Sequence, residues 1–393
     1  MKDLKILIAG AGLGGLAAAC ALTKAGHRVE VYEQAPQLGE VGAGIQVSAN
    51  ATHALRDIGV LDEILKVAVK PGAYVFRAWD TGEVLQRFAL SEEHERLHGA
   101  PYVQIHRADL HEILATRARE LDPDMIHLNH VVTGFSEDAS GVELHFADGT
   151  SARGDMLIGA DGLKSAVRAQ IAGEVPATYT GDAVWRLTVP TERLPAGLLD
   201  TVMNVFMGPG AHVVCYYLRG GELVNFVASV ETEEMEESYK LKLPWERLKA
   251  DMKGWSPIIQ AIIDAADKDE CYLWSLRNRP AIPNWSTARA TLLGDAAHPT
   301  LPYLAQGAVM AFEDGAVLTR SLAQADSISD ALQLYQRNRI ERTTRIVNQS
   351  TANRSLFHMR SPEEMREAFA KRDEGADRNA WLYSYNPLTV ELA

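Results

Sequence analysis

The chain has 393 residues, 47% of them hydrophobic and 23% charged, and this predicts a globular protein of about two to three domains. Its formal net charge of −13 argues against broad electrostatic binding to nucleic acid or to an anionic membrane surface. The three cysteines, Cys20, Cys215 and Cys271, are far apart and odd in number, which argues against a disulfide framework and indicates a reducing compartment.

The chain opens with the pattern of a strand, a glycine-rich turn, a helix and a second strand. Residues 4–9 form a continuous apolar run, as expected of a strand buried on both faces of a parallel sheet. The run is too short for a signal-peptide core or a membrane span, so we expect a cytoplasmic protein without a membrane anchor. Residues 16–24 predict a helix, and the alternation of Val29 and Val31 predicts the second strand.

The turn between the first strand and the helix carries the spacing Gly10-x-Gly12-x-x-Gly15. Gly10 allows a tight turn, Gly12 lets a pyrophosphate approach the backbone, and Gly15 lets the helix pack close to the strand. The helix N-terminus then offers free N–H groups to the phosphates. Glu33, at the end of the second strand, is placed to accept hydrogen bonds from a ribose diol. The motif predicts a dinucleotide site, but it does not distinguish FAD from NAD.

The middle and the C-terminal part alternate between helical and strand patterns. Residues 142–146 predict an antiparallel strand that ends in a turn at 148–149. Four short strands at 183–190, 201–207, 212–218 and 223–230 predict the sheet of a second domain. Helices are predicted at 51–70, 109–120, 245–265, 306–324, 328–352 and 362–373. We interpret the basic run Arg337, Arg339, Arg342 and Arg345 as a solvated helix face.

Two further strands deliver an aspartate to a turn. The apolar residues before Gly159 lead into Asp161, and the apolar residues 290–293 lead into Gly294 and Asp295. By itself, the turn at Asp161 could be any strand-to-helix turn. At Asp295, an acceptor at the end of the sheet suits a sugar or ribityl hydroxyl.

These three motifs, in this order, resemble the class A flavoprotein monooxygenases, within the salicylate, 3-hydroxybenzoate and 6-hydroxynicotinate hydroxylase group. The resemblance implies an α/β fold with a Rossmann-like FAD-binding domain, an inserted β-sheet substrate domain and C-terminal helices. It places the FAD-binding domain at 1–72, 98–178 and 275–325. The substrate domain would comprise 73–97 and 179–274, and the helical segment 326–393.

The resemblance also implies the residues that contact FAD. The N-terminus of the helix that opens at Gln306 and Gly307 would stabilise negative charge on the reduced flavin. The implied cofactor-binding residues are Gly10, Gly12, Leu13, Gly14, Gly15, Glu33, Gln34, Gly44, Arg107, Asp161, Asp295, Pro302, Gln306, Gly307 and Ala308.

The substrate pocket is implied by two segments, 42–46 and 302–308. Hydroxynicotinate hydroxylases carry histidine at the positions of Gln46 and Tyr303, so this chain departs from that branch. Tyr216 and Tyr217 lie on opposite faces of one predicted strand, and we expect Tyr217 to bind the substrate hydroxyl, with Tyr216 as the alternative. The catalytic candidates are Tyr217, Tyr216, Gln46, Tyr303 and His298, and the substrate-binding candidates are Arg186, Gln46, Tyr217 and Tyr303.

Arg186 is either a carboxylate anchor or part of an ion pair, and His298 is either catalytic or a pocket wall. The twelve histidines show no metal-ligand spacing, so no metal site is predicted.

The family chemistry uses bound FAD, NAD(P)H and O2. A flavin C4a-hydroperoxide transfers OH to an electron-rich ring, here a small hydroxylated aromatic acid such as salicylate. Because the chain has only one dinucleotide motif, we expect the nicotinamide nucleotide to bind transiently. We expect it to be NADH, and we expect the enzyme to be a monomer or homodimer. The alternatives are 3-hydroxybenzoate or 6-hydroxynicotinate as substrate, a flavin-dependent reductase or halogenase, and a flavin-binding protein without turnover. The Trp-x-Trp-x-Ile signature of halogenases is absent.

Overall fold

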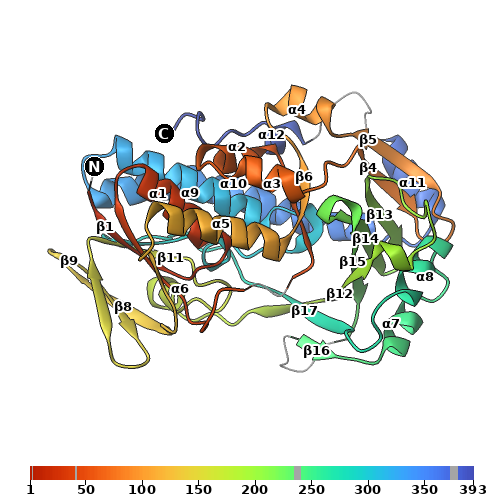
Figure 1. Cartoon of the computed structure of the whole chain (residues 1–393), viewed down its shortest axis with the longest axis horizontal. Coiled ribbons are helices and arrows are strands. Elements are labelled where there is room, and N and C mark those ends of the chain that lie inside the picture. Colours follow the sequence, from red (N-terminus) through yellow and green to blue (C-terminus); the bar gives the residue numbers. More distant parts are fainter. Residues whose placement is uncertain (2, 40–41, 234–239, 372–378) are drawn as a thin grey trace.

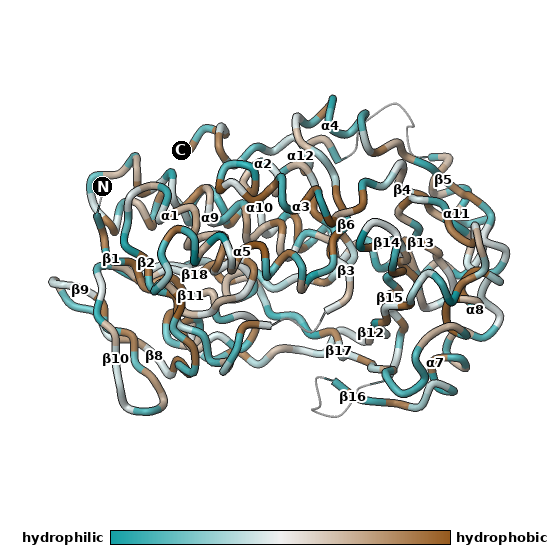
Figure 2. Tube along the Cα trace, viewed as in Figure 1, coloured by the Kyte–Doolittle hydropathy of each residue, from teal (hydrophilic) through white to brown (hydrophobic). Residues whose placement is uncertain are grey.

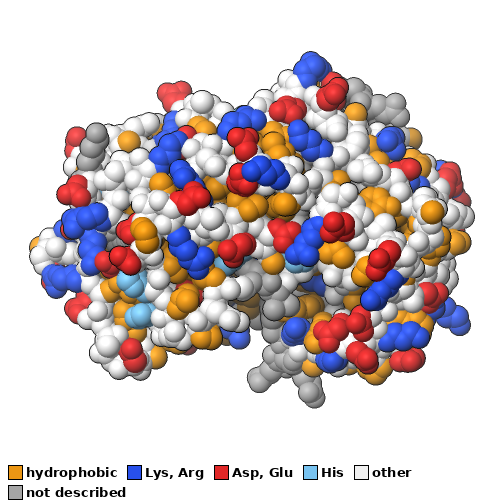
Figure 3. Space-filling model, viewed as in Figure 1, with side chains coloured by type: hydrophobic (Ala, Val, Ile, Leu, Met, Phe, Trp, Pro, Cys, Tyr) orange, Lys and Arg blue, Asp and Glu red, His pale blue; other side chains and the backbone are white. Residues whose placement is uncertain are grey.

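The computed structural model of the chain describes residues 1, 3–39, 42–233, 240–371 and 379–393. The parallel sheet and most of the helices occupy one half of the molecule, and a large mixed sheet with α7, α8 and α11 occupies the other (Figure 1). Hydrophobic residues concentrate along the strands of both sheets (Figure 2). On the face shown in Figure 3, acidic and basic side chains are interspersed.

The first half is built on a five-stranded parallel sheet. Its order is β18 (Ala290–Leu292), β11 (Met156–Gly159), β1 (Lys5–Ala9), β2 (Arg28–Tyr32) and β7 (Ile126–His127). Helix α1 (Leu13–Lys24) packs against α5 (Arg107–Leu121) and α9 (Gly307–Gln324). The three strands β8 (Val132–Asp138), β9 (Gly141–Phe146) and β10 (Ser151–Gly154) form a separate small sheet. This arrangement confirms the predicted Rossmann-like α/β fold.

The second half is an eight-stranded mixed sheet. Its order is β16 (Lys240–Lys242), β17 (Tyr272–Asn278), β12 (Thr178–Pro190), β15 (Leu223–Glu231), β14 (Ala211–Leu218), β13 (Met203–Gly208), β4 (Ala73–Ala78) and β5 (Val84–Ala89). Helices α7 (Trp245–Asp251) and α8 (Pro257–Asp264) contribute buried residues to a core with β12, β14 and β15. The opposite face of the same sheet is therefore left to form a wall of the site.

The remaining elements connect and cover the two halves. They are β3 (Gly44–Val47), α2 (Ala49–Asp57), α3 (Leu61–Val67), α4 (Glu92–His98), β6 (Val103–His106), α6 (Ala166–Ala172), α10 (Ile328–Phe357), α11 (Pro362–Ala370) and α12 (Ala380–Tyr383). The helix predicted at 51–70 is two helices, α2 and α3, because the chain turns at Gly59 with a φ of +82°. The exact domain boundaries stay a prediction.

The basic run on α10 is only partly a solvated face. Arg337 and Arg345 are exposed, as predicted, but the prediction is wrong for Arg339, whose side chain is fully buried. Its guanidinium pairs with Glu313 and Asp314 of α9, each at 2.7 Å. Burying a guanidinium without a partner would cost much desolvation free energy, and the two carboxylates supply the partners.

The three cysteines are free and buried. Within the described residues, we find no helix with the length and apolar character needed to cross a membrane.

Candidate active site

The glycine-rich turn contains two kinds of glycine. Gly10 has a φ of +102°, and a Cβ there would lie 2.5 Å from the carbonyl oxygen of Ala160. A Cβ at Gly15 would lie 2.1 Å from the carbonyl oxygen of Gly10. A Cβ at Gly12 would have no atom within 4 Å. The fold itself therefore demands Gly10 and Gly15, whereas Gly12 borders open space at the N-terminus of α1, where a pyrophosphate would approach.

Glu33 is fixed beside this turn. Its carboxylate accepts hydrogen bonds from the N–H groups of Ala11 and Ala35, each at 2.9 Å. The following residue, Gln34, is exposed. A contact of either side chain with the ribose stays a prediction.

A cleft of about 360 Å³ extends from the glycine-rich turn to the large sheet. Its lining from the first half includes Gly12, Leu13, Gly14, Gly15, Gly44, Gln46, Arg107, Asp295, Pro302, Gly307 and Ala308. Its lining from the large sheet is Val184, Arg186, His212, Val214, Tyr216, Val227 and Ser229. The cleft thus brings together most of the cofactor residues that the sequence implied.

Asp295 lies in the cleft directly after β18, near the N-terminus of α9. Shielding from bulk water raises the pKa of its carboxyl, while His298 and Arg107 act in the opposite direction. A carboxylate that is accessible from the cleft and lies near a helix N-terminus suits a polyhydroxyl chain that ends in an electron-accepting ring.

Two of the implied cofactor residues have other partners. The carboxylate of Asp161 accepts the N–H groups of Ala166 and Val167 and thereby caps α6. The side chain of Gln306 donates to the Ser48 hydroxyl at 3.1 Å and does not line the cleft. For these side chains, direct contact with FAD is not supported, and each positions a neighbouring turn instead.

These residues fit FAD. Gly12 leaves room for a pyrophosphate, the helix N-terminus of α1 has no side-chain cap that would compete for its N–H groups, and Asp295 can accept a hydroxyl. When bound, FAD accepts a hydride from NAD(P)H and, once reduced, activates O2.

Gly12→Val should yield a folded protein that binds no FAD, because the new side chain enters only the space that the pyrophosphate needs. Flavin absorbance and isothermal titration of the apoprotein with FAD measure the loss. As a matched control, Gly15→Val should fail at folding, since the backbone of Gly10 blocks it. Normal FAD affinity in Gly12→Val would place the cofactor elsewhere.

The large sheet offers one face to the cleft, and strand register decides which side chains reach it. On β14, His212, Val214 and Tyr216 line the cleft. Tyr217 points to the other face, where it packs near α7 and α8 and its hydroxyl donates to the Leu199 carbonyl at 3.2 Å. The prediction that Tyr217 binds the substrate is therefore wrong, and its alternative, Tyr216, occupies the cleft face.

Tyr216 packs tightly against the first half. A Cβ at Gly44 would lie 2.7 Å from the Tyr216 hydroxyl, so only glycine allows this approach. Tyr216 also hydrogen-bonds Gln46, which in turn accepts the hydroxyl of Tyr102. Burial raises the pKa of Tyr216, so its hydroxyl stays protonated and can donate.

Two other catalytic candidates lie outside the cleft lining. Tyr303 is behind it, where its hydroxyl donates to Asp182 at 2.6 Å and lies 3.0 Å from the hydroxyl of Ser229. His298 lies 2.6 Å from a carboxylate oxygen of Asp314 and lines a different cavity, with Trp285. Buried carboxylates hold both side chains outside the cleft lining, and a role of Tyr303 in substrate contact or of His298 in catalysis stays a prediction.

Sequence reasoning missed His212. It is only 3% exposed and lines the cleft two residues before Val214 and four before Tyr216, on the same strand face. Burial and the neighbouring His358 hold the pKa of its imidazole well below the usual range. The ring is therefore neutral at pH 7. Period-two alternation from Tyr216 was the signal that would have found it.

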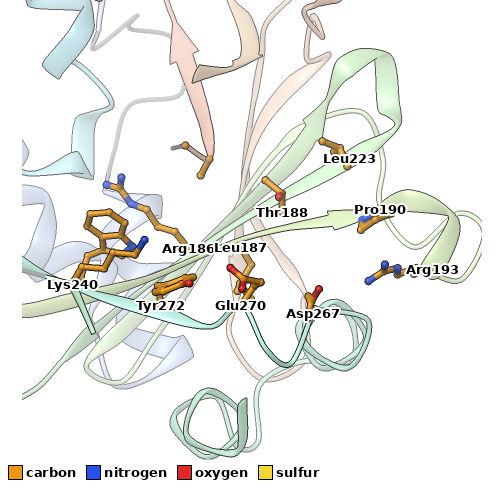
Figure 4. Close-up of a pocket in the computed structure, with 13 residues that line it drawn as sticks. Arg186, Leu187, Thr188, Pro190, Arg193, Leu223, Lys240, Asp267, Glu270 and Tyr272 are labelled. Atoms are coloured by element: carbon orange, nitrogen blue, oxygen red, sulfur yellow. The ribbon is translucent and has the colours of Figure 1, made fainter. Parts of the chain in front are cut away.

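Arg186 joins the cleft to a second cavity. This cavity measures about 400 Å³ and shares Ala43 and Arg186 with the cleft. Figure 4 shows Arg186, Lys240 and Tyr272 gathered at one end and Arg193 and Asp267 at the other. The Lys240 ammonium lies 3.9 Å from the centre of the Tyr272 ring. An antechamber lined by aromatic, basic and acidic side chains therefore borders the cleft.

Comparison with known proteins agrees with this reading. Residues 3–350 match the family model described as FAD binding domain. The chain is 36% identical over 389 residues to 3-hydroxybenzoate 6-hydroxylase of Polaromonas naphthalenivorans (strain CJ2), covering 98% of this chain and 96% of that protein. It is also 36% identical over 393 residues to 6-hydroxynicotinate 3-monooxygenase of Pseudomonas fluorescens, covering 99% and 96%.

Solved structures are similar along nearly the whole chain. Klebsiella pneumoniae HpxO complexed with FAD and uric acid has a TM-score of 0.83 at 27% identity, covering 94% of this chain and 92% of that one. A salicylate hydroxylase substrate complex has a TM-score of 0.82 at 23% identity, covering 98% and 96%, and supports the fold alone. The chain therefore belongs to the FAD-binding-domain family and is an FAD-dependent aromatic monooxygenase, which hydroxylates a small aromatic substrate with NAD(P)H and O2.

Proposed function

We propose that the substrate is a hydroxylated aromatic acid of the salicylate type, and that NADH is the hydride donor. One observation carries the proposal: a cation and a neutral, buried imidazole stand on the same sheet face, separated by an apolar wall. The cation is Arg186, the imidazole is His212, and the wall is Val214 and Val227.

Strand register fixes this arrangement. His212 pairs with Ser229, which pairs with Val184, and these three form one row across the sheet. The next row on the same face is Val214, Val227 and Arg186. Arg186 lies two strands away from His212, which is about 10 Å across the sheet, and two residues further along, which is about 7 Å in the strand direction. With both side chains reaching inward, a benzene ring with a carboxylate and a hydroxyl fits between them.

The local charge suits an anion although the whole protein is acidic. Arg186 and Arg107 both line the cleft, and the N-terminus of α9 opens into it at Gly307. The helix N-terminus adds partial positive charge without a titratable group. Interactions with these positive groups would therefore offset the hydration free energy that a carboxylate substrate loses on entering the cleft.

In the proposed mechanism, His212 removes the proton of the substrate hydroxyl through Nε2 and so raises the electron density of the ring. Tyr216 and Gln46 hold the ring edge, since their mutual hydrogen bond fixes both side chains at the cleft wall. Val184, Val214 and Val227 keep that wall apolar, which helps to exclude water. We also expect the enzyme to act in the cytoplasm as a monomer or homodimer.

The experiment is a panel of aromatic compounds tested for stimulated NADH oxidation, with the product identified for each. The panel contains salicylate, 3-hydroxybenzoate, 6-hydroxynicotinate and the matching neutral amides. We expect the acids to be turned over and the amides to be poor substrates. Turnover of the amides alone would overturn the proposal, and faster turnover of 6-hydroxynicotinate than of the benzoates would favour the alternative substrate.

Arg186→Met should raise the KM for the acid by about ten- to a hundredfold, because a charge-assisted hydrogen bond contributes about 1.5–3 kcal/mol. The KM for the neutral amide should stay nearly unchanged, since it lacks the carboxylate. Arg193→Met, in the antechamber but outside the cleft lining, is the matched control. Equal effects on acid and amide would assign Arg186 a purely structural role.

A further inference from the structure

A row of hydrogen-bonded side chains leads from the cleft to the protein surface. Nδ1 of His212 lies 3.0 Å from Nε2 of His358, and Nδ1 of His358 lies 3.0 Å from Oε1 of Glu231. The side chain of His358 is 3% exposed, whereas that of Glu231 is 40% exposed. The row therefore begins at a side chain that lines the cleft and ends in solvent.

The protonation states along this row follow from its exposed end. An ionised Glu231 can only accept, so Nδ1 of His358 carries a hydrogen. In a neutral ring, Nε2 of His358 is then an acceptor, and Nδ1 of His212 must donate to it. Nε2 of His212 keeps its lone pair, and the described part of the chain offers this atom no hydrogen-bond partner. His212 is thus held in the tautomer that can take a proton from a ligand in the cleft.

We propose that His358 and Glu231 form a relay that carries the proton of the substrate hydroxyl from His212 to solvent. The inference rests on the proposed function, in which His212 is the base. The O–H bond of the substrate breaks as Nε2 of His212 gains the proton. The hydrogen on Nδ1 of His212 passes to Nε2 of His358, and that on Nδ1 of His358 passes to the carboxylate of Glu231. Glu231 then releases a proton to water.

The relay resolves a conflict in the site. Burial disfavours a cationic imidazole, and it lowers the pKa of both His212 and His358. A lone buried histidine with a depressed pKa would hold a substrate proton only weakly. In the relay each ring exchanges one hydrogen for another, so both end neutral and only the tautomers change.

The charges that face His358 are compatible with this route. Arg354 of α10 contacts Asp182 at 2.7 Å and Glu231 at 3.1 Å, and Tyr303 donates to Asp182 at 2.6 Å. Burial lowers the pKa of His358 most, Glu231 and Asp182 raise it, and Arg354 adds to the lowering, so the ring is not held as a cation. The ligand atoms of Asp182, Glu231 and His358 lie within 4.8 Å of one another, but the guanidinium already supplies the positive charge that a metal ion would bring.

The relay is tested by the kinetics of proton release. Holoenzyme is mixed with salicylate or 3-hydroxybenzoate in weakly buffered solution, and a pH indicator and the absorbance of the bound phenolate are followed together. Glu231→Gln preserves an acceptor for His358 but cannot take up a proton, so it should slow both signals by about tenfold or more. Glu222→Gln, an exposed glutamate just before β15, is the matched control and should match the parent.

Chemical rescue separates a relay from a structural role. Formate should restore the rate of Glu231→Ala, and imidazole that of His358→Ala, each in proportion to its concentration. An unchanged rate in Glu231→Gln, or slow variants that no added buffer restores, would overturn the relay. If the parent itself releases no proton with any phenolic acid, the proposed function fails instead.

The tautomers provide a readout that needs no substrate. In holoenzyme labelled with ¹⁵N-histidine, NMR should find His212 and His358 neutral at pH 7, with hydrogen on Nδ1 in both rings. Glu231→Gln should keep this pattern, since its amide oxygen still accepts. Hydrogen on Nε2 of His212 would overturn the relay whatever the substrate proves to be.

Discussion

His212→Phe should slow hydroxylation by about 10²- to 10⁴-fold while FAD stays bound, because it removes the proposed general base and retains a ring of similar size. The ring of His212 packs at 5.0 Å from that of Tyr303, a contact that phenylalanine preserves. Single-turnover rates with the best acid substrate measure the loss, and the flavin spectrum checks cofactor binding. His145→Asn, on the small sheet of β8 to β10, should match the parent.

The pH dependence gives a second check on His212. Since its pKa is depressed, the imidazole stays neutral and basic from alkaline pH down through neutrality, and the parent rate should fall only in acid. In His212→Phe the substrate hydroxyl must ionise unaided, so the rate should rise with pH toward the phenol's own pKa, near 10 for an unperturbed phenol. A pH-independent rate in the variant would contradict a role as base.

Arg339→Met should destabilise the protein by about 3–5 kcal/mol, because it breaks a buried ion pair and leaves carboxylates without their cation. Both Glu313 and Asp314 are fully buried and contact Arg339 at 2.7 Å. Urea unfolding of the FAD-free protein, followed by circular dichroism, measures the change in the free energy of unfolding.

Arg337→Met, on the exposed side of the same helix, is the control and should change stability by no more than about 0.5 kcal/mol. A loss below about 1 kcal/mol in Arg339→Met would mean that Arg342, which also pairs with Glu313 at 2.7 Å, compensates for the missing cation. The double variant with Arg342→Met would then show a loss much larger than the sum of the two.

Local motifs made much of the fold and of the cleft lining predictable. The turn at Gly10 to Gly15 needs only its own backbone geometry, so glycine spacing identifies it without tertiary information. Asp295 could be found for the same reason, since a strand that ends in a turn fixes where its side chain lies.

Features that depend on partners distant in sequence could not be predicted. Tyr216 and Tyr217 are equivalent in pattern, and only pairing with β15 and the helices behind it decides which one faces the cleft. From sequence alone, Arg339 looks like a surface residue. The two carboxylates of α9 that pair with it are brought beside it only by the fold. His298 and Tyr303 were plausible catalysts for their residue types, but buried acids hold them elsewhere.

The strand order of the parallel sheet also constrains how the chain can fold. β11 lies between β1 and β18, yet β18 is reached only after the strands β12 to β17 of the second sheet. A nascent chain therefore exposes an unpaired edge of β11 while that sheet is synthesised. Such long-range pairing is slow and prone to aggregation. Because Asp295 and α9 follow β18 in the chain, FAD cannot stabilise the early stages of folding. Flavin supplied during expression should therefore raise the yield of folded protein only through the last step of folding.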